Sequence, residues 1–324
     1  MRALTLALLL LLSPLSTQAQ SVAWPAFGPV RNLLKLDGLT DTLPDFIGPI
    51  DGSAELTIFT EGNHYPVLLP LVLRDFPEWC RVNRACSADA SRILVVTLPQ
   101  PMIVRMLKKG GIALGNAVLP VGPGRAVFPD LVMGGIAPLR QLHAAGIVGD
   151  RAQVFAHSRG MAMLASKSLD AGDLGQFSGQ VGRLVVASPS EPGARRQYRE
   201  TSAALVGEDA TARLFGHELV SFPGRLGIQH RDVPYALVNG LADGGLIFAH
   251  LAAFYAGVFP DRLRAVAVPG AERFGQDIAM TRTVHARSPM ADAFQRFFLE
   301  KARAAYPEGG FADLGAGFGA QVGL

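Results

Sequence analysis

The chain has 324 residues, of which 49% are hydrophobic and 18% are charged, so it is long enough to form more than one buried core. Its formal net charge is only +3, and the basic residues are scattered along the sequence instead of forming runs. This distribution gives no support to nucleic-acid binding, which depends on a basic patch or stripe.

The first 19 residues have the form of a secretory signal peptide. Arg2 supplies the basic start, residues 6–12 are an apolar core, and Thr17-Gln18-Ala19 fits a small-x-small cleavage site. The apolar core is shorter than the roughly 20 residues that a membrane-spanning helix needs. We therefore expect residues 1–19 to be removed and the chain to be exported.

Two cysteines, Cys80 and Cys86, lie in the part of the chain that we expect to be exported. Disulfides form and persist in such oxidising compartments, and an even count at close spacing favours pairing. The sequence predicts a Cys80–Cys86 disulfide that closes a short loop, with two unpaired thiols as the alternative.

Strands and helices are predicted to alternate from residue 56 onward. A buried strand at 56–59 leads into the polar turn 60–65, and a helix begins at Pro66, where the missing N–H of proline costs nothing. The short, β-branched run 93–97 is a second strand, followed by a helix at 99–108. This alternation is typical of a parallel sheet flanked by helices.

The other predicted elements continue the alternation. They are strands at 117–121, 153–156, 184–187, 244–248, 263–268 and 278–283, and helices at 129–145, 192–206, 232–239, 250–255 and 290–305. Residues 161–166 fit either a strand or a helix. The Gly-rich tail after Tyr306 is expected to be loosely held.

Four segments carry a family resemblance in their order and spacing. They are the strand and loop 56–65, the segment 155–164, the strand-to-helix turn 188–198 and the run 238–248, which contains Ala-Asp-Gly-Gly. Together they resemble the type II periplasmic solute-binding proteins of ABC transporters, and among them the molybdate-binding-like members. The resemblance covers roughly residues 55–305.

The resemblance implies an α/β fold of two lobes, with mixed but mostly parallel sheets flanked by helices and joined by two crossing strands. Lobe one would comprise residues 20–157 plus 277–324, and lobe two would comprise residues 158–276. The implied function is a monomeric, non-enzymatic receptor in the periplasm without a cofactor. It would capture a small polar or anionic solute, such as a molybdate-like oxyanion, and present it to an inner-membrane ABC permease.

Candidate ligand-binding residues lie where strands end, because ligands of open α/β sheets bind at the carboxyl ends of strands. In the first lobe they are Thr60, Glu61, Gly62, Asn63, His64 and Gln100. A carboxylate at Glu61 would repel an oxyanion. Glu61 and His64 would instead suit a cationic group, a metal or a hydroxylated solute.

The remaining candidates are hydrogen-bond donors near a helix start or near the expected crossing between the lobes. They are Ser158, Arg159, Ser188, Ser190, His230 and Arg231. The two serines before the helix at 192 can cap it or reach an anion at its N-terminus. Arg159 can clamp an acidic solute with two parallel hydrogen bonds, or it can be an ordinary surface arginine.

A competing enzymatic interpretation starts from Ala156-His-Ser-Arg-Gly160, which approximates the Gly-x-Ser-x-Gly nucleophile elbow of a secreted α/β-hydrolase. Asp243 or Asp261 and then His285 would complete the expected chain order around Ser158. No His-Gly-Gly-Gly motif precedes the serine, and a five-residue match arises easily by chance, so the binding protein is favoured. The sequence leaves open a third alternative, the ligand-sensing partner of a membrane sensor kinase.

Overall fold

The computed structural model describes residues 46–84, 86, 89–114, 117–189, 191–219, 230, 232–286 and 288–324. The predicted signal peptide at 1–19 and the candidate residues Ser190 and Arg231 lie outside this part of the chain. Within it, none of the helices combines the length and the hydropathy needed to cross a bilayer.

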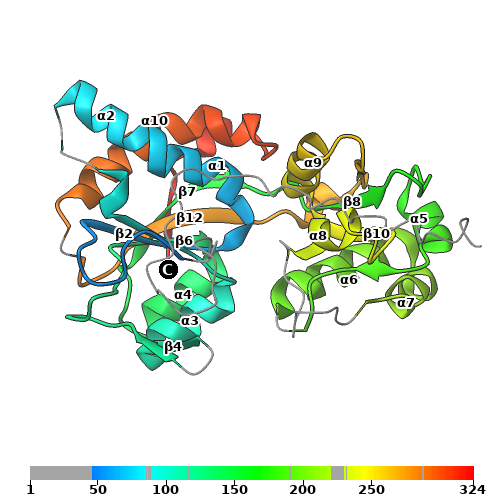
Figure 1. The fold of residues 1–324 in the computed structure, drawn as a ribbon, viewed down its shortest axis with the longest axis horizontal. Coiled ribbons are helices and arrows are strands. Elements are labelled where there is room, and N and C mark those ends of the chain that lie inside the picture. Colours follow the sequence, from blue (N-terminus) through cyan, green and yellow to red (C-terminus); the bar gives the residue numbers. More distant parts are fainter. Residues whose placement is uncertain are drawn as a thin grey trace, which may run out of the picture.

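Two sheets organise the structure, and each lies in its own lobe (Figure 1). The large sheet has seven strands, in the order β1 (Phe46–Ile47), β3 (Ile93–Thr97), β2 (Leu56–Thr60), β6 (Leu131–Gly135), β12 (Asp277–Arg282), β7 (Arg151–His157) and β13 (Gln321–Gly323). The small sheet has four strands, in the order β11 (Leu263–Ala267), β8 (Met161–Ser166), β10 (Gly244–Phe248) and β9 (Leu184–Val185).

Helices cover both faces of the large sheet, which is why its central strands are continuously buried. One face carries α1 (Tyr65–Pro70), a π-helical turn (Leu71–Asp75), α2 (Phe76–Asn83) and α10 (Met290–Glu308), and the other carries α3 (Gln100–Lys109) and α4 (Ile136–Ala144) (Figure 1). Successive strand side chains point to opposite faces. Ile58 accordingly packs in the core that contains Phe294, whereas Phe59 packs in the core that contains Leu139.

The helices of the small lobe surround its sheet in the same manner. They are α5 (Leu174–Gln180), α6 (Pro192–Val206), α7 (Glu208–Gly216), α8 (Asp232–Val238) and α9 (Ala249–Val258). Short 3-10 turns at Gly62–His64, Ala90–Arg92, Ala271–Phe274 and Gly315–Gly317 connect the larger elements of both lobes. The predicted disulfide between Cys80 and Cys86 is present, and it joins Cys80 within α2 to Cys86 in the segment between α2 and β3.

Two chain connections link the sheets, residues 158–160 between β7 and β8 and residues 268–276 between β11 and β12. They are hydrogen-bonded to each other: Ser158 N–H donates to the Gln276 carbonyl (2.9 Å), and Gln276 N–H donates to Ser158 Oγ (3.0 Å). The strands that enter this crossing are also paired, through the side chains of His157 and Asp277 (2.7 Å). We propose that the lobes divide here, after residues 157 and 276, as the resemblance implies.

Several sequence expectations are wrong in detail. The sheets are mixed but not mostly parallel, since the large sheet has two parallel and four antiparallel strand pairs. The reason is that β12 and β7, which lead into the connections, and the terminal β13 all join their neighbours antiparallel. The predicted strand at 117–121 does not join this sheet, because β5 (Ala117–Pro120) forms a separate hairpin with β4 (Gly111–Leu114).

Two further segments differ more strongly. The sequence predicts one helix over residues 129–145, but β6 occupies Leu131–Gly135 and α4 begins only at Ile136, because the apolar run pairs with β2 and β12 as a strand of the large sheet. The sequence also predicts a loosely held C-terminal tail, but β13 pairs with β7 and Phe311 is fully buried.

Candidate functional site

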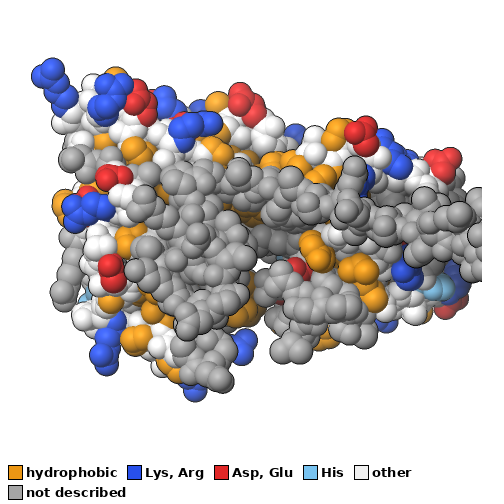
Figure 2. Space-filling model, viewed as in Figure 1, with side chains coloured by type: hydrophobic (Ala, Val, Ile, Leu, Met, Phe, Trp, Pro, Cys, Tyr) orange, Lys and Arg blue, Asp and Glu red, His pale blue; other side chains and the backbone are white. Residues whose placement is uncertain are grey.

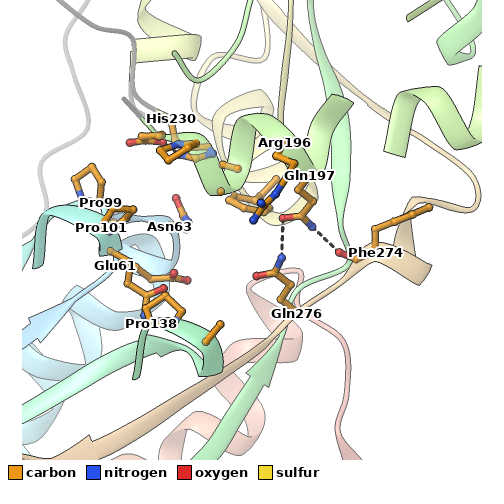
Figure 3. A pocket seen from close by; sticks show the side chains of 18 of the residues that line it. Glu61, Asn63, Pro99, Pro101, Pro138, Arg196, Gln197, His230, Phe274 and Gln276 are labelled. Atoms are coloured by element: carbon orange, nitrogen blue, oxygen red, sulfur yellow. Dashed lines mark hydrogen bonds and ion pairs between the residues drawn. The ribbon is translucent and has the colours of Figure 1, made fainter. Parts of the chain in front are cut away.

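A cavity of about 600 Å³ lies between the two lobes (Figures 2 and 3). Its wall combines residues of the large lobe, the small lobe and the connection 268–276. The polar and charged residues that line it are Glu61, Asn63, Gln100, Gln141, Glu191, Arg196, Gln197, Glu200, His230 and Gln276. Prolines and two phenylalanines, Phe248 and Phe274, supply much of the apolar lining.

Glu61 brings a carboxylate into the cavity from the large lobe (Figure 3). It directly follows β2 and has an extended backbone, and its N–H donates to the Met133 carbonyl of the neighbouring strand (3.3 Å). Desolvation raises the pKa of Glu61 to about 7; the charge of His230 lowers that pKa and the charge of Glu191 raises it. Both residues line the same cavity from the small lobe, opposite Glu61.

A second carboxylate, Glu191, comes from the small lobe immediately before α6. His230 Nδ1 lies 2.5 Å from Glu191 Oε2, and His230 Nε2 lies 2.6 Å from the Tyr198 hydroxyl. Burial, and next the charge of Glu191, raise the pKa of Tyr198 well above its ordinary value, so the hydroxyl keeps its proton and donates to Nε2. Nδ1–H then donates to Glu191, and this chain fixes the carboxylate at the cavity wall.

Glutamine side chains provide the neutral part of the polar wall. Gln100 Oε1 accepts from Gly135 N–H (3.1 Å), which holds the start of α3 against β6. Gln197 Nε2 donates to the Phe274 carbonyl (2.5 Å), and Gln276 Nε2 donates to Gln197 Oε1 (3.3 Å) (Figure 3). The last two bonds join α6 of the small lobe to the connection between the lobes.

Thr60 and His64 lie behind the wall of the cavity and do not line it. His64 Nδ1 is 2.6 Å from the Tyr306 hydroxyl, and His64 Nε2 is 2.5 Å from Thr60 Oγ1. Burial lowers the pKa of His64 to about 3, with a smaller contribution from His250, and burial raises that of Tyr306 well above its ordinary value. Tyr306 therefore donates to a neutral His64, His64 donates to Thr60, and Thr60 donates to the Glu61 carbonyl (3.2 Å).

The other predicted site residues divide into two groups. Gly62, Asn63, Gln100 and His230 line the cavity together with Glu61. Arg159 is instead turned to the C-terminal segment, where Nε donates to the Phe311 carbonyl (3.2 Å), and Ser188 is buried outside the cavity lining. Ser158 lines only a side chamber of about 30 Å³ that also touches Glu61 and Asn63.

The residues around Ser158 do not form a nucleophile elbow. That motif requires a turn from a strand into a helix, whereas β7 is followed by the strand β8. Asp243 does not face a histidine: its carboxylate accepts from the Arg183 N–H (2.9 Å) at a turn. His285 lies against the ring of Phe128, with 6.1 Å between the ring centroids.

Sequence reasoning missed Glu191, Gln197 and Gln276. The available signal was their position: Glu191 precedes the predicted helix at 192, Gln197 lies within that helix, and Gln276 precedes the crossing strand at 278. Among the described residues, no group of three or more His, Cys, Asp or Glu side chains is arranged to hold a metal ion.

Comparison with solved structures identifies the fold. Similar structures are the substrate binding protein of an ABC transporter from Agrobacterium tumefaciens (TM-score 0.53, 12% identity, covering 79% of this chain and 77% of that one) and iron-bound HitA from Pseudomonas aeruginosa (TM-score 0.52, 12% identity, 82% and 88%). The sulfate-binding protein SubI from Mycobacterium tuberculosis is a third (TM-score 0.50, 15% identity, 80% and 86%). No family model and no curated protein sequence matches the chain. The chain therefore has the two-lobed α/β fold of the type II periplasmic solute-binding proteins.

Proposed function

We propose that this chain is an exported solute-binding receptor that captures a small polar solute between its lobes and presents it to an ABC permease in the inner membrane. The observation that supports this function best is the cavity itself, which takes polar side chains from both lobes and from the connection between them. A volume of about 600 Å³ lies within the range of small-molecule sites, roughly 300–1,000 Å³.

Binding between two lobes provides the signal that such a receptor needs. A ligand shifts the population toward a closed form only if it interacts more favourably with that form, which requires contacts to both lobes. Glu61 and Glu191 lie on opposite lobes of this cavity, and Gln276 lies on the connection. A solute that touches all three would stabilise one arrangement of the lobes for the permease to recognise.

The nature of the cavity favours an organic solute over a molybdate-like oxyanion. Of the described lining residues, Arg196 carries the one guanidinium, and it lies 4.0 Å from the Glu200 carboxylate with both side chains mostly exposed. Glu61 and Glu191 face the interior and would repel an anion. Because the same fold occurs in an iron-bound protein and in a sulfate-binding protein, the lining residues and not the fold must select the solute.

A thermal-shift screen of the mature chain tests this function. The panel contains metal salts, oxyanions including molybdate and sulfate, and small organic solutes grouped as cations, neutral compounds and anions. We expect one class to raise the melting temperature progressively, since a ligand at 100 times its Kd stabilises the folded state by about 2.7 kcal/mol.

A matched pair of variants locates the binding. Gly193 lines the cavity and Gly216 does not, and a Cβ atom added at either position meets no atom within 4 Å. Gly193→Phe should therefore abolish the ligand-induced shift, whereas Gly216→Phe should retain it. A panel that leaves the melting temperature unchanged throughout, or a shift that survives in Gly193→Phe, would contradict the proposed receptor.

A further inference from the structure

Among the lining residues that the structure describes, carboxylates outnumber basic side chains away from the exposed rim of the cavity. Arg196 and Glu200 offset each other at the exposed rim, where their side chains are 74% and 65% accessible. The other charged or titratable side chains among the described lining residues are the carboxylates of Glu61 and Glu191 and the imidazole of His230. Within the described lining, the carboxylate of Glu61 on the large lobe therefore faces a second carboxylate, Glu191, on the small lobe.

The main chain of Glu61 is hydrogen-bonded to Met133 and Thr60, but its side-chain carboxylate forms no hydrogen bond or ion pair with any of the residues that the structure describes. Its carboxylate points into the cavity, and the side chains beside it in the large lobe are those of Asn63, Pro99, Pro101 and Pro138 (Figure 3). None of these carries a positive charge. A buried or half-buried carboxylate without a cationic partner is unfavourable, and a ligand that supplies the partner recovers that free energy.

Glu191 is more deeply buried, with 7% of the residue accessible, and it has a fixed orientation. Its Oε2 accepts from His230, which is held on its other side by Tyr198 and stacks on Phe248 with 4.9 Å between ring centroids. Among the described residues, Oε1 has no such partner, so it remains available to a donor in the cavity. A charge held in place before binding costs little reorganisation when the ligand arrives.

Resting on the receptor function above, we propose that the solute is a small organic cation whose protonated amine lies between Glu61 of the large lobe and Glu191 of the small lobe. An ammonium group has three donors and no acceptor, which matches two acceptor-only carboxylates on opposite walls. The amide groups of Gln100, Gln197 and Gln276 bind the uncharged part of the solute, since they offer both donors and acceptors.

Matched ligand sets test this assignment of charge. One set contains 1,5-diaminopentane, 1,5-pentanediol and pentanedioate, and a second contains glucosamine, glucose and glucuronate, so that charge varies on a shared skeleton. The sets are added to a wider panel of primary and quaternary amines with neutral and anionic analogues. We expect stabilisation by amines and none by their neutral or anionic counterparts at the same concentration.

The residues are tested by calorimetric titration of the amine that stabilises the chain most. Glu61→Gln and Glu191→Gln should each weaken binding roughly tenfold to a hundredfold, the loss typical of one charge-assisted hydrogen bond. Glu208→Gln is the matched control, because Glu208 is an exposed carboxylate of the small lobe on α7, outside the cavity lining. It should bind within twofold of the wild type.

Failure of this inference is distinguishable from failure of the receptor function. If a neutral compound or an anion stabilises the chain and amines do not, the receptor stands and the cation is wrong. If amines bind equally well to Glu61→Gln and to the wild type, the assigned carboxylate is wrong. If none of the compounds binds, both proposals fall together.

Discussion

Affinity for a cationic solute should fall about tenfold when the pH is lowered from 8 to 6. The pKa of Glu61 is about 7, raised chiefly by desolvation, with His230 lowering it and Glu191 raising it. A carboxyl group with that pKa is about nine-tenths ionised at pH 8 and about one-tenth ionised at pH 6. Because only the ionised form attracts an ammonium group, binding requires the removal of this proton and strengthens as the pH rises.

Calorimetric titration at both pH values, at constant ionic strength, measures this dependence. The amine must keep its proton throughout, which primary alkylamines with a pKa near that of lysine do. The charges of His230 and Glu191 act on Glu61. Glu61 in turn adds to the effect of burial in raising the pKa of Tyr198 and of Tyr306, so groups other than Glu61 could add to the pH dependence. Glu61→Gln therefore serves as the control and should lose most of the pH dependence. Equal affinity at pH 6 and pH 8, or stronger binding at pH 6, would contradict the role of Glu61.

Replacement of Gly275 by Ala should destabilise the crossing between the lobes by about 3 kcal/mol, at the upper end of the range for overpacking. A Cβ atom at Gly275 would lie 2.1 Å from the Ser158 carbonyl oxygen and 2.5 Å from His157 Nε2. The contact with Ser158 is to backbone, which cannot move without breaking its paired hydrogen bonds to Gln276. The added methyl group would therefore force the two connections apart.

Gly160 in the other connection gives an independent test of the same crossing. Its φ is +75°, and a Cβ atom there would lie 2.0 Å from the Ala271 carbonyl oxygen, so alanine meets both backbone strain and a clash. Gly179→Ala is the control, since Gly179 lies in α5 with no atom within 4 Å of an added Cβ. Urea denaturation should show large losses for the two connection variants and a slight gain for the control. Wild-type stability in Gly275→Ala would show that the connections are not packed as described.

The sequence predicts best the elements that are determined locally. The helix at 192–206 and the strands at 93–97 and 244–248 were predicted at their observed bounds, because Pro192 fixes a helix start and short β-branched or Gly-led apolar runs suit buried strands. The helix predicted at 129–145 fails for the opposite reason. Leu131–Gly135 is apolar and is followed directly by the helix α4, so the local sequence does not separate the two. This segment is a strand because it pairs with β2 and β12.

The same distinction applies to the C-terminal tail. A glycine-rich run gives no local signal for a strand, and β13 forms because Gln321 and its neighbours pair with β7, which is far away in the sequence. The burial of Phe311 depends on stacking with His250 of the small lobe, with 4.0 Å between ring centroids. The sequence around residues 311–323 gives no sign of either partner, β7 or His250.

The site is partly predictable for a topological reason. Glu61, Asn63 and Gln100 follow the parallel strands β2 and β3, whose carboxyl ends necessarily share one edge of the sheet. The same rule placed Thr60 and His64 at that edge but could not show that Tyr306 of α10 binds His64 and keeps both behind the wall. That contact joins residues 242 positions apart in the chain.

The small-lobe half of the site cannot be predicted from local sequence patterns. Glu191 is oriented by His230 and Tyr198, which come from different segments, and Gln197 meets Gln276 only because the connection passes α6. The rule that ligands bind at strand ends therefore predicts the large-lobe wall of the cavity, but most of the small-lobe wall is missed.

The most direct measurement is a crystal structure of the chain with the amine that stabilises it most, at pH 8. We expect density for the solute in the cavity between the lobes, with its nitrogen within hydrogen-bonding distance of both Glu61 and Glu191. A solute bound elsewhere, or one whose nitrogen faces solvent while a neutral group contacts the two carboxylates, would show that Glu61 and Glu191 do not form a cation site.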